Sequence, residues 1–342
     1  MSSLATFELL KWTTSQAENA TLILSGSAPP SLSIKDLVGL SSDQATTSHN
    51  LSLDSLSLSL GRIQGSEGLR KAIAALYDDT VTLENVLTTI GATGANALVF
   101  QGLLKQGDHV ISLYPSYTQL ISLPKAITGA EVSLWKPDID GDVNSSIHSL
   151  ENLVRPTTKM IVLNNPNNPT GTMLSPQLQH EILKLVHSHD IIIVVDEIFR
   201  PLYHDPNTHL PPSFVELSDQ SSRVVVTGSL SKAWGLAGVR TGWITTKNTD
   251  LFTELEKFKT YTVNSTSLID EVIATEALSH RCRPHILSKH LGLAQQNLDL
   301  LQISSMSILN FVGGSGRARV LLHLCSFQLM VAPSTMWTFV GD

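Results

Sequence analysis

Residues 228–242 read GSLSKAWGLAGVRTG, and this stretch decides how the rest of the chain is interpreted. Lys232 stands between a serine pair and a glycine-rich turn, and Arg240 follows the turn. A lysine amine can form an imine with an aldehyde, while an arginine and a hydroxyl such as that of Ser229 can bind a phosphate. The stretch therefore suits a phosphorylated aldehyde, although a surface lysine in a Gly/Ser loop would read the same way.

Length and composition limit the classes of protein that remain. The chain has 342 residues and a net charge of -7, which fits one large α/β domain with a smaller one and shows no basic stripe for nucleic acid. The N-terminal stretch has no signal-peptide pattern, and no apolar run reaches the roughly 20 residues that cross a bilayer. The two cysteines, Cys282 and Cys325, form no CxxC pair. We expect a cytoplasmic protein that acts away from membranes.

Apolar runs of strand length alternate with helical patterns along the middle of the chain. The runs lie at residues 86–90, 109–114, 159–165, 191–197 and 224–230. Ser175 and Pro176 open one intervening helix as N-cap and first helical residue. Uninterrupted apolar strands separated by helices indicate a parallel sheet covered on both faces. We predict a doubly wound, mostly parallel α/β domain over residues 61–250, an N-terminal arm with part of a small domain over 1–60, and a helical, incomplete small domain over 251–342.

Ligands of open α/β sheets bind beyond the carboxyl ends of the strands, so the residues after each strand are candidates. Gly91, Ala92 and Thr93 follow the first strand and leave backbone N–H groups at a helix N-terminus, where a phosphate can bind; small residues there also allow close packing. Tyr117 follows the second strand. Its ring can stack on a flat heteroaromatic ring or simply close a core.

Two polar candidates follow the next two strands. Asn168 belongs to NNPNNPTG (164–171), where its amide can donate to a ring oxygen or merely shape a turn. Asp196 begins DEIF (196–199) at the end of a buried run. A buried carboxylate needs a partner, which can be a protonated ring nitrogen or the N-terminus of a helix.

In this chain order, the strings NNPNNPTG, DEIF and GSLSKAWGLAGVRTG resemble the motifs of the class I/II aminotransferases, which are fold-type I enzymes that use pyridoxal 5'-phosphate (PLP). The resemblance covers about residues 60–245. It implies a homodimer that moves an amino group between an amino acid and a 2-keto acid through a Schiff base on Lys232. By residue, it implies that Lys232 is also the proton-transferring base, that Asp196 pairs with the ring nitrogen, that Asn168 donates to the phenolate oxygen, that Tyr117 stacks on the ring, and that Gly91, Ala92, Thr93, Ser229 and Arg240 hold the phosphate.

Other reactions of the same cofactor, such as elimination, racemisation or oxidation, use the same binding residues and stay open. So does a PLP-binding protein of degenerate activity. Three departures from the family motivate that alternative: Phe199 stands where the family usually has a tyrosine, Leu60 stands where a tyrosine usually reaches the neighbouring subunit, and the end of the chain does not follow the family pattern. The missing hydroxyl at Phe199 predicts a higher pKa for the Schiff-base nitrogen.

The last part of the chain also departs from the family pattern, in which an arginine near the end binds the substrate carboxylate. We expect an altered or truncated C-terminus, with Arg317 or Arg319 as weak substitutes and Gly26 as a residue that can approach the carboxylate. The histidines near Cys282 have no zinc-site spacing, so no metal is expected.

Overall fold

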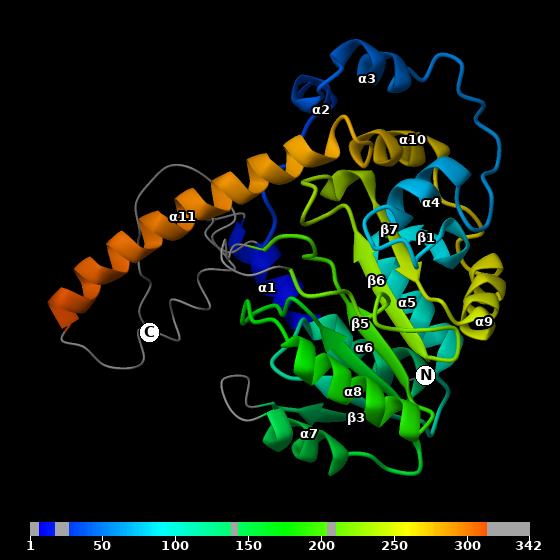
Figure 1. The fold of residues 1–342 in the computed structure, drawn as a ribbon, viewed down its shortest axis with the longest axis vertical. Helices are drawn as coiled ribbons and strands as arrows, with labels where there is room; N and C mark the ends of the chain where they lie inside the picture. The colour runs from blue at the N-terminus through cyan, green and yellow to red at the C-terminus, as the bar shows by residue number, and fades with distance from the viewer. Residues whose placement is uncertain (1–6, 18–26, 138–142, 204–209, 313–342) are drawn as a thin grey trace.

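The computed structural model describes residues 7–17, 27–137, 143–203 and 210–312. Its centre is a seven-stranded sheet in the order β1-β7-β6-β5-β4-β2-β3 (Figure 1). The strands are β1 (Val86–Ile90), β2 (His109–Leu113), β3 (Glu131–Trp135), β4 (Thr158–Asn164), β5 (Ile192–Asp196), β6 (Val224–Ser229) and β7 (Thr241–Thr245). Neighbours from β3 to β6 are parallel, and β7 runs antiparallel to both β1 and β6. The predicted mostly parallel α/β fold is confirmed.

Helices cover both faces of this sheet because side chains alternate between its faces. On β4, Met160 and Val162 point to the face covered by α5 (Gly91–Leu103), α6 (Thr118–Thr128) and α9 (Thr249–Thr260). Ile161 and Leu163 point to the opposite face, under α7 (Val143–Glu151) and α8 (Pro176–Ser188). The central strands are therefore buried on both faces of the sheet. This is why their sequences are uninterrupted apolar runs.

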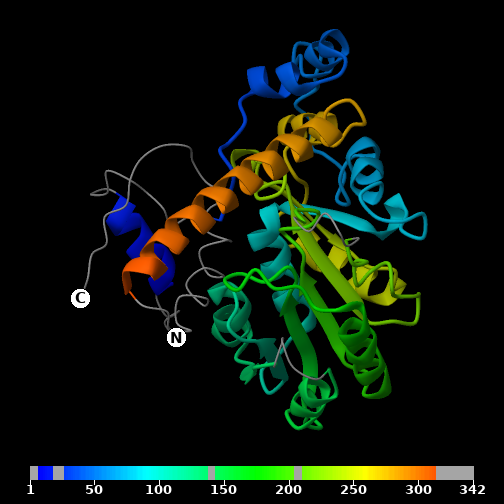
Figure 2. The same ribbon diagram turned by 60° about the vertical axis from the view of Figure 1, so that its left-hand side comes forward.

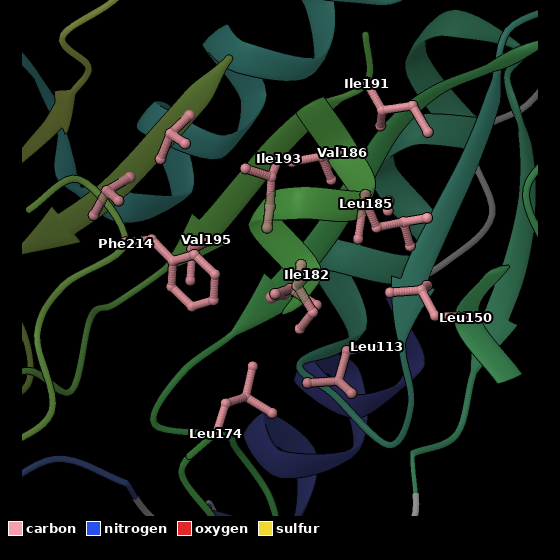
Figure 3. Packing of buried hydrophobic residues seen from close by; sticks show 14 of the residues in the cluster. Leu113, Leu150, Leu174, Ile182, Leu185, Val186, Ile191, Ile193, Val195 and Phe214 are labelled. Carbon is pink, nitrogen blue, oxygen red and sulfur yellow. The ribbon is translucent and has the colours of Figure 1, made fainter. Parts of the chain in front are cut away.

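Figure 3 shows the packing under α8. Ile182, Leu185 and Val186 of that helix meet Ile193 and Val195 of β5, and all five side chains are buried. The Ser175 hydroxyl accepts a hydrogen bond from the Leu178 N–H and Pro176 takes the first helical position, as the sequence predicts. The helix thus begins where its cap fixes it, with its apolar stripe facing the sheet.

A third apolar cluster brings residues from before β1 together with residues from after β7. It is formed by α2 (Ile34–Leu40), α4 (Glu67–Ala74), α10 (Leu268–Ala277) and the first part of α11 (Arg283–Val312), packed around Trp234. Figures 1 and 2 show α11 extending away from the sheet toward α1 (Glu8–Ala17). A further short helix, α3 (Gln44–Asn50), follows α2 and contacts α10. Within the described residues, no helix is both long and apolar enough to cross a membrane.

Several elements were not predicted, among them α1, α2 and α3 in the N-terminal arm, the strand β7 and the short 3-10 helix Ala237–Val239. The strand β7 begins at the end of the lysine motif, and the 3-10 helix lies inside it. The sequence TGWIT has no clear strand pattern, because five residues with a glycine carry little periodicity. Its pairing with β1 and β6 is non-local, so only the assembled sheet identifies it as a strand.

At Gly242, the backbone of β7 packs closely against the start of α5. A Cβ atom at Gly242 would lie 2.3 Å from the backbone carbon of Gly91. We expect Gly242→Ala to lower the free energy of unfolding by about 1–3 kcal/mol, because neither backbone can move without breaking the sheet. Urea denaturation measures the change. Gly292→Ala is the control, since its Cβ meets nothing within 4 Å; equal stability of both variants and the parent would contradict the packing.

Candidate functional site

A cavity of about 230 Å³ opens at the carboxyl ends of the parallel strands. Because β1 and β2 to β6 point the same way, the residues that follow each strand meet at one edge of the sheet. Segments far apart in sequence, from residue 27 to residue 240, contribute to the walls. Most of the sequence-predicted site residues line this cavity, namely Ala92, Thr93, Tyr117, Asn168, Asp196, Lys232 and Arg240.

Asp196 lies at the floor of this cavity and is only 3% exposed. Its Oδ1 accepts a hydrogen bond from the Ile198 N–H (3.0 Å) and its Oδ2 accepts one from Asn96 Nδ2 (2.9 Å). Burial raises the pKa of Asp196, whereas both hydrogen bonds and the positive charge of Lys232 act to lower it. The site therefore presents a carboxylate surrounded by donors.

Lys232 enters the same cavity from the loop after β6. Its Nζ donates a hydrogen bond to Ser27 Oγ (2.9 Å) and lies 6.0 Å from the centre of the Phe199 ring. Burial lowers the pKa of Lys232, and the charge of Asp196 opposes this effect. A lysine with a lowered pKa is more often neutral near neutral pH, which is the state in which an amine can attack an aldehyde or take up a proton.

Arg240 lies against the turn that begins α5. Its Nη1 donates to the Ala237 carbonyl (3.1 Å), and its Nη2 would be 2.7 Å from a Cβ atom at Gly91. Gly91 also has a φ of +64°, so a glycine is needed there for both conformation and space. This close approach brings a guanidinium next to the N-terminal N–H groups of α5, a pairing that suits a phosphate.

The two serines of the lysine motif divide their roles. Ser229 is 1% exposed and does not line the cavity; its hydroxyl donates to Ser231 Oγ (2.8 Å) and accepts from the Ser231 N–H (2.9 Å). Ser231 lines the cavity. Gly91 does not line the cavity either, but it lies against Arg240, which does.

The NNPNNPTG turn is held to the end of β5 by Asn164. Its side chain accepts from the Asn168 N–H (2.7 Å) and donates to the Asp196 carbonyl (2.9 Å). Asn168 is thereby fixed beside Asp196, and both line the cavity. Tyr117 closes the wall above the α5 turn, and its ring meets the ring of Phe7 edge-on at 5.9 Å. Burial raises the pKa of Tyr117, and the negative charge of Asp196 adds to the effect.

Several lining residues were missed from the sequence, among them Ser27, Asn96, Gln119, Asn164 and Ser231. Asn96 has a usable signal, because it stands one helical turn after Thr93 on α5. Ser27 has none, since it comes from a loop distant in sequence. Phe199 lines the cavity as a buried ring without a hydroxyl.

The other candidate residues are either absent from the lining of the cavity or outside the described residues. Leu60 is 73% exposed and is not part of the lining. Gly26, Arg317 and Arg319 fall outside the described residues. Across the ranges that the structure describes, no group of three or more His, Cys, Asp or Glu side chains could hold a metal ion. His290 is instead buried, with its Nδ1 bonded to the Ala233 carbonyl (2.9 Å).

A larger cavity, of about 680 Å³, lies beside Asn85 and Lys247. The amino group of Lys247 is already bonded there to Thr80 Oγ1 (2.6 Å) and to the Ser218 carbonyl (2.9 Å). This cavity contains none of the residues predicted from the motifs. The residues predicted from the motifs line the smaller cavity instead, so that cavity is the candidate site.

Comparisons with known proteins show the family to which the chain belongs. Capreomycidine synthase from Streptomyces vinaceus is 33% identical over 228 residues, which are 67% of this chain and 57% of that protein. Glutamate-pyruvate aminotransferase from Escherichia coli is 33% identical over 53% of this chain and 45% of its own length. A PLP-dependent aminotransferase from Streptococcus suis has a similar structure, with a TM-score of 0.77 and 33% identity over 88% of this chain and 77% of that one.

The chain spans about half the length of these curated relatives. A PLP-dependent cyclase named OrfR is also structurally similar, with a TM-score of 0.71 and 27% identity over 83% of this chain and 70% of that one. The family model for aminotransferase class I and II matches residues 37–281, a region that includes every residue predicted to bind the cofactor. The fold, the strand-end site and this match together show that the chain belongs to the class I and II aminotransferase family.

Proposed function

We propose that this protein is a PLP-dependent aminotransferase that moves an amino group between an amino acid and a 2-keto acid. The observation that carries the proposal is the meeting of Lys232 and Asp196 in one cavity, each affecting the pKa of the other. A buried amine of lowered pKa and a buried carboxylate are the two groups that this chemistry requires.

The residues of the cavity fit the cofactor by the chemistry of their polar groups. Asp196 offers a buried acceptor to a ring N–H, Asn168 an amide donor to a ring oxygen, and Tyr117 a flat face. Arg240 binds the phosphate together with the N–H groups of the Gly91, Ala92 and Thr93 turn. The Ser229–Ser231 hydroxyl pair completes that end, with Ser231 toward the cavity.

Bound PLP supplies an electrophilic aldehyde and a ring that accepts electrons. Lys232 provides the amine that anchors the cofactor and, once released, takes the proton from Cα of the amino acid with Nζ. A lowered pKa increases the fraction of Nζ that is neutral, which is the form that acts as a base. Asp196 meanwhile keeps a proton on the ring nitrogen, because an ionised carboxylate stabilises the positive charge there.

The proposal is tested by a half-reaction without any acceptor. Cofactor-loaded protein is mixed with single amino acids, and the absorbance is followed as the cofactor is converted to its amine form. We expect at least one amino acid to convert the cofactor stoichiometrically and release its keto acid, and a keto acid to restore the original spectrum.

Keto-acid dependence separates transamination from the other reactions that PLP supports. Turnover without an amino acceptor would instead indicate elimination, racemisation or a cyclisation, the last being pertinent because the similar proteins include a cyclase. Bound cofactor with no conversion across a panel of amino acids would overturn the assignment and indicate a binding protein.

We also propose a homodimer in the cytoplasm. Leu58, Leu60 and Tyr261 are 81%, 73% and 83% exposed. Large exposed apolar side chains favour coverage by a partner. The thiol of Cys282 is buried and free, which suits a reducing compartment.

A further inference from the structure

We propose that Asn96 and Thr227 are positioning residues that hold Asp196 ionised and aimed at the cofactor ring. The proposal rests on the proposed function, because it concerns the carboxylate of the same site. Neither residue was predicted from the sequence motifs. Both are buried, Asn96 at 1% and Thr227 at 0% exposure.

The three side chains meet between α5 and the sheet. Thr227 of β6 is the register partner of Asp196 on the neighbouring strand β5. Asn96 comes from the second turn of α5, which packs over β6 and β7. Its Nδ2 donates to Asp196 Oδ2 (2.9 Å), and its Oδ1 accepts from Thr227 Oγ1 (2.8 Å).

The orientation of the Asn96 amide is decided by its partners. With Asp196 ionised, a flipped amide would place its oxygen against Oδ2, which then only accepts hydrogen bonds. The second amide hydrogen faces Gln119 Oε1 at 3.4 Å, and Gln119 Nε2 in turn donates to the Thr93 carbonyl (3.1 Å). Every polar atom of Asn96 therefore has a partner, and only one orientation satisfies them all.

This arrangement opposes the effect of burial, which raises the pKa of Asp196. One carboxylate oxygen accepts from Asn96 and the other from the Ile198 N–H, so each is held by one donor. Among the described residues, the titratable groups that interact with Asp196 are Lys232 and Tyr117, and the charge of Arg240 acts on Tyr117 in turn. Of the two hydrogen-bond donors, the Ile198 N–H belongs to the backbone, so only the Asn96 amide can be removed by a substitution. Thr227 fixes the direction in which the Asn96 amide donates.

The experiment compares Asn96→Leu, Thr227→Val and Thr227→Ser. Affinity for PLP is measured by equilibrium titration at several pH values from about 5 to about 9. We expect Asn96→Leu to weaken binding by about 10- to 100-fold, as for the loss of a hydrogen bond to a charged group. The acid limb of the affinity profile should move to higher pH, since removal of the donor raises the pKa of Asp196. Thr227→Val should weaken binding and move the acid limb in the same direction by a smaller amount. Thr227→Ser keeps the hydroxyl and should have the profile of the parent.

A second readout needs no cofactor. In the cofactor-free protein, the free energy of unfolding of Asn96→Leu should go on falling to higher pH than that of the parent, because Asp196 stays protonated longer in the folded state. Ser112→Ala is the matched control. It removes a buried hydroxyl that donates to the Leu120 carbonyl, and Ser112 lies on β2, which β4 separates from the strand of Asp196. Thr227→Val keeps the test valid if Asn96→Leu does not fold.

The outcomes separate positioning from a structural role. Lower stability and weaker binding with an unchanged acid limb would overturn the proposal, as would an equal shift in Ser112→Ala. Failure of the amino-acid half-reaction in the parent protein would count against the proposed function only, because the affinity and unfolding profiles do not require turnover.

Discussion

Replacing Lys232 by alanine is expected to abolish transamination, with a loss of more than about 10⁴-fold in turnover. The variant loses both the amine that anchors the cofactor and the base that moves the Cα proton. No described residue lining the cavity besides Lys232 carries an amine, so none can replace it. The covalent attachment is measured independently of activity, by intact mass after the loaded protein is reduced with borohydride.

The parent protein should gain the mass of one reduced pyridoxyl group, and Lys232→Ala should gain none. Lys184→Ala is the control, because its side chain is 69% exposed on α8 and pairs with Glu181. It should label and turn over like the parent. Labelling of Lys232→Ala at the parent level would show that another amine holds the cofactor.

Replacing Asp196 by asparagine is expected to lower turnover by about 10²- to 10³-fold, a loss typical of one preorganised electrostatic group. Affinity for PLP should fall by about 10- to 100-fold, since a hydrogen bond to a charged group is lost. Asparagine keeps the size of the side chain but has a single acceptor oxygen, so it can accept from Asn96 or from the Ile198 N–H and not from both. The loss therefore reports the charge together with one hydrogen bond. Unchanged turnover in this variant would contradict the pairing of Asp196 with the ring nitrogen.

The same substitution has a signature in the cofactor-free protein. Burial raises the pKa of Asp196 from its ordinary value of 3.8, so between that value and the raised one the folded state binds more protons than the unfolded state. The free energy of unfolding therefore falls as the pH rises through this window and levels off above it. Subtracting the profile of Asp196→Asn from that of the parent isolates this contribution, because the other carboxylates cancel. A difference that does not vary with pH would contradict the raised pKa.

Much of the fold and part of the site can be predicted from local patterns. The strands β1, β2, β4, β5 and β6 appear as apolar runs because both faces of a parallel sheet are buried. The polar residues after those runs are found by the same rule, since parallel strands bring their carboxyl ends together. This reasoning selects Asp196, Asn168 and Lys232, which line one cavity.

Residues with a supporting role are harder to predict, because their partners are remote in sequence. Ser27 meets Lys232 Nζ across a separation of 205 residues, and Thr227 meets Asn96 across 131. Ser229 looks like a cavity residue from its place in the motif, yet its hydroxyl turns toward Ser231. Such facing directions depend on how neighbouring elements pack, which no local pattern contains.

The sequence by itself determined the lysine, the carboxylate and the amide of the site, together with the sheet that carries them. These features depend on residue type and on short-range periodicity, which are both readable along the chain. Only the tertiary structure decided that β7 closes the sheet against β1, that Gly242 lies against Gly91, and that Asn96 faces Asp196. Each of these is a contact between distant segments, and such contacts exist only once the helices and strands have packed together.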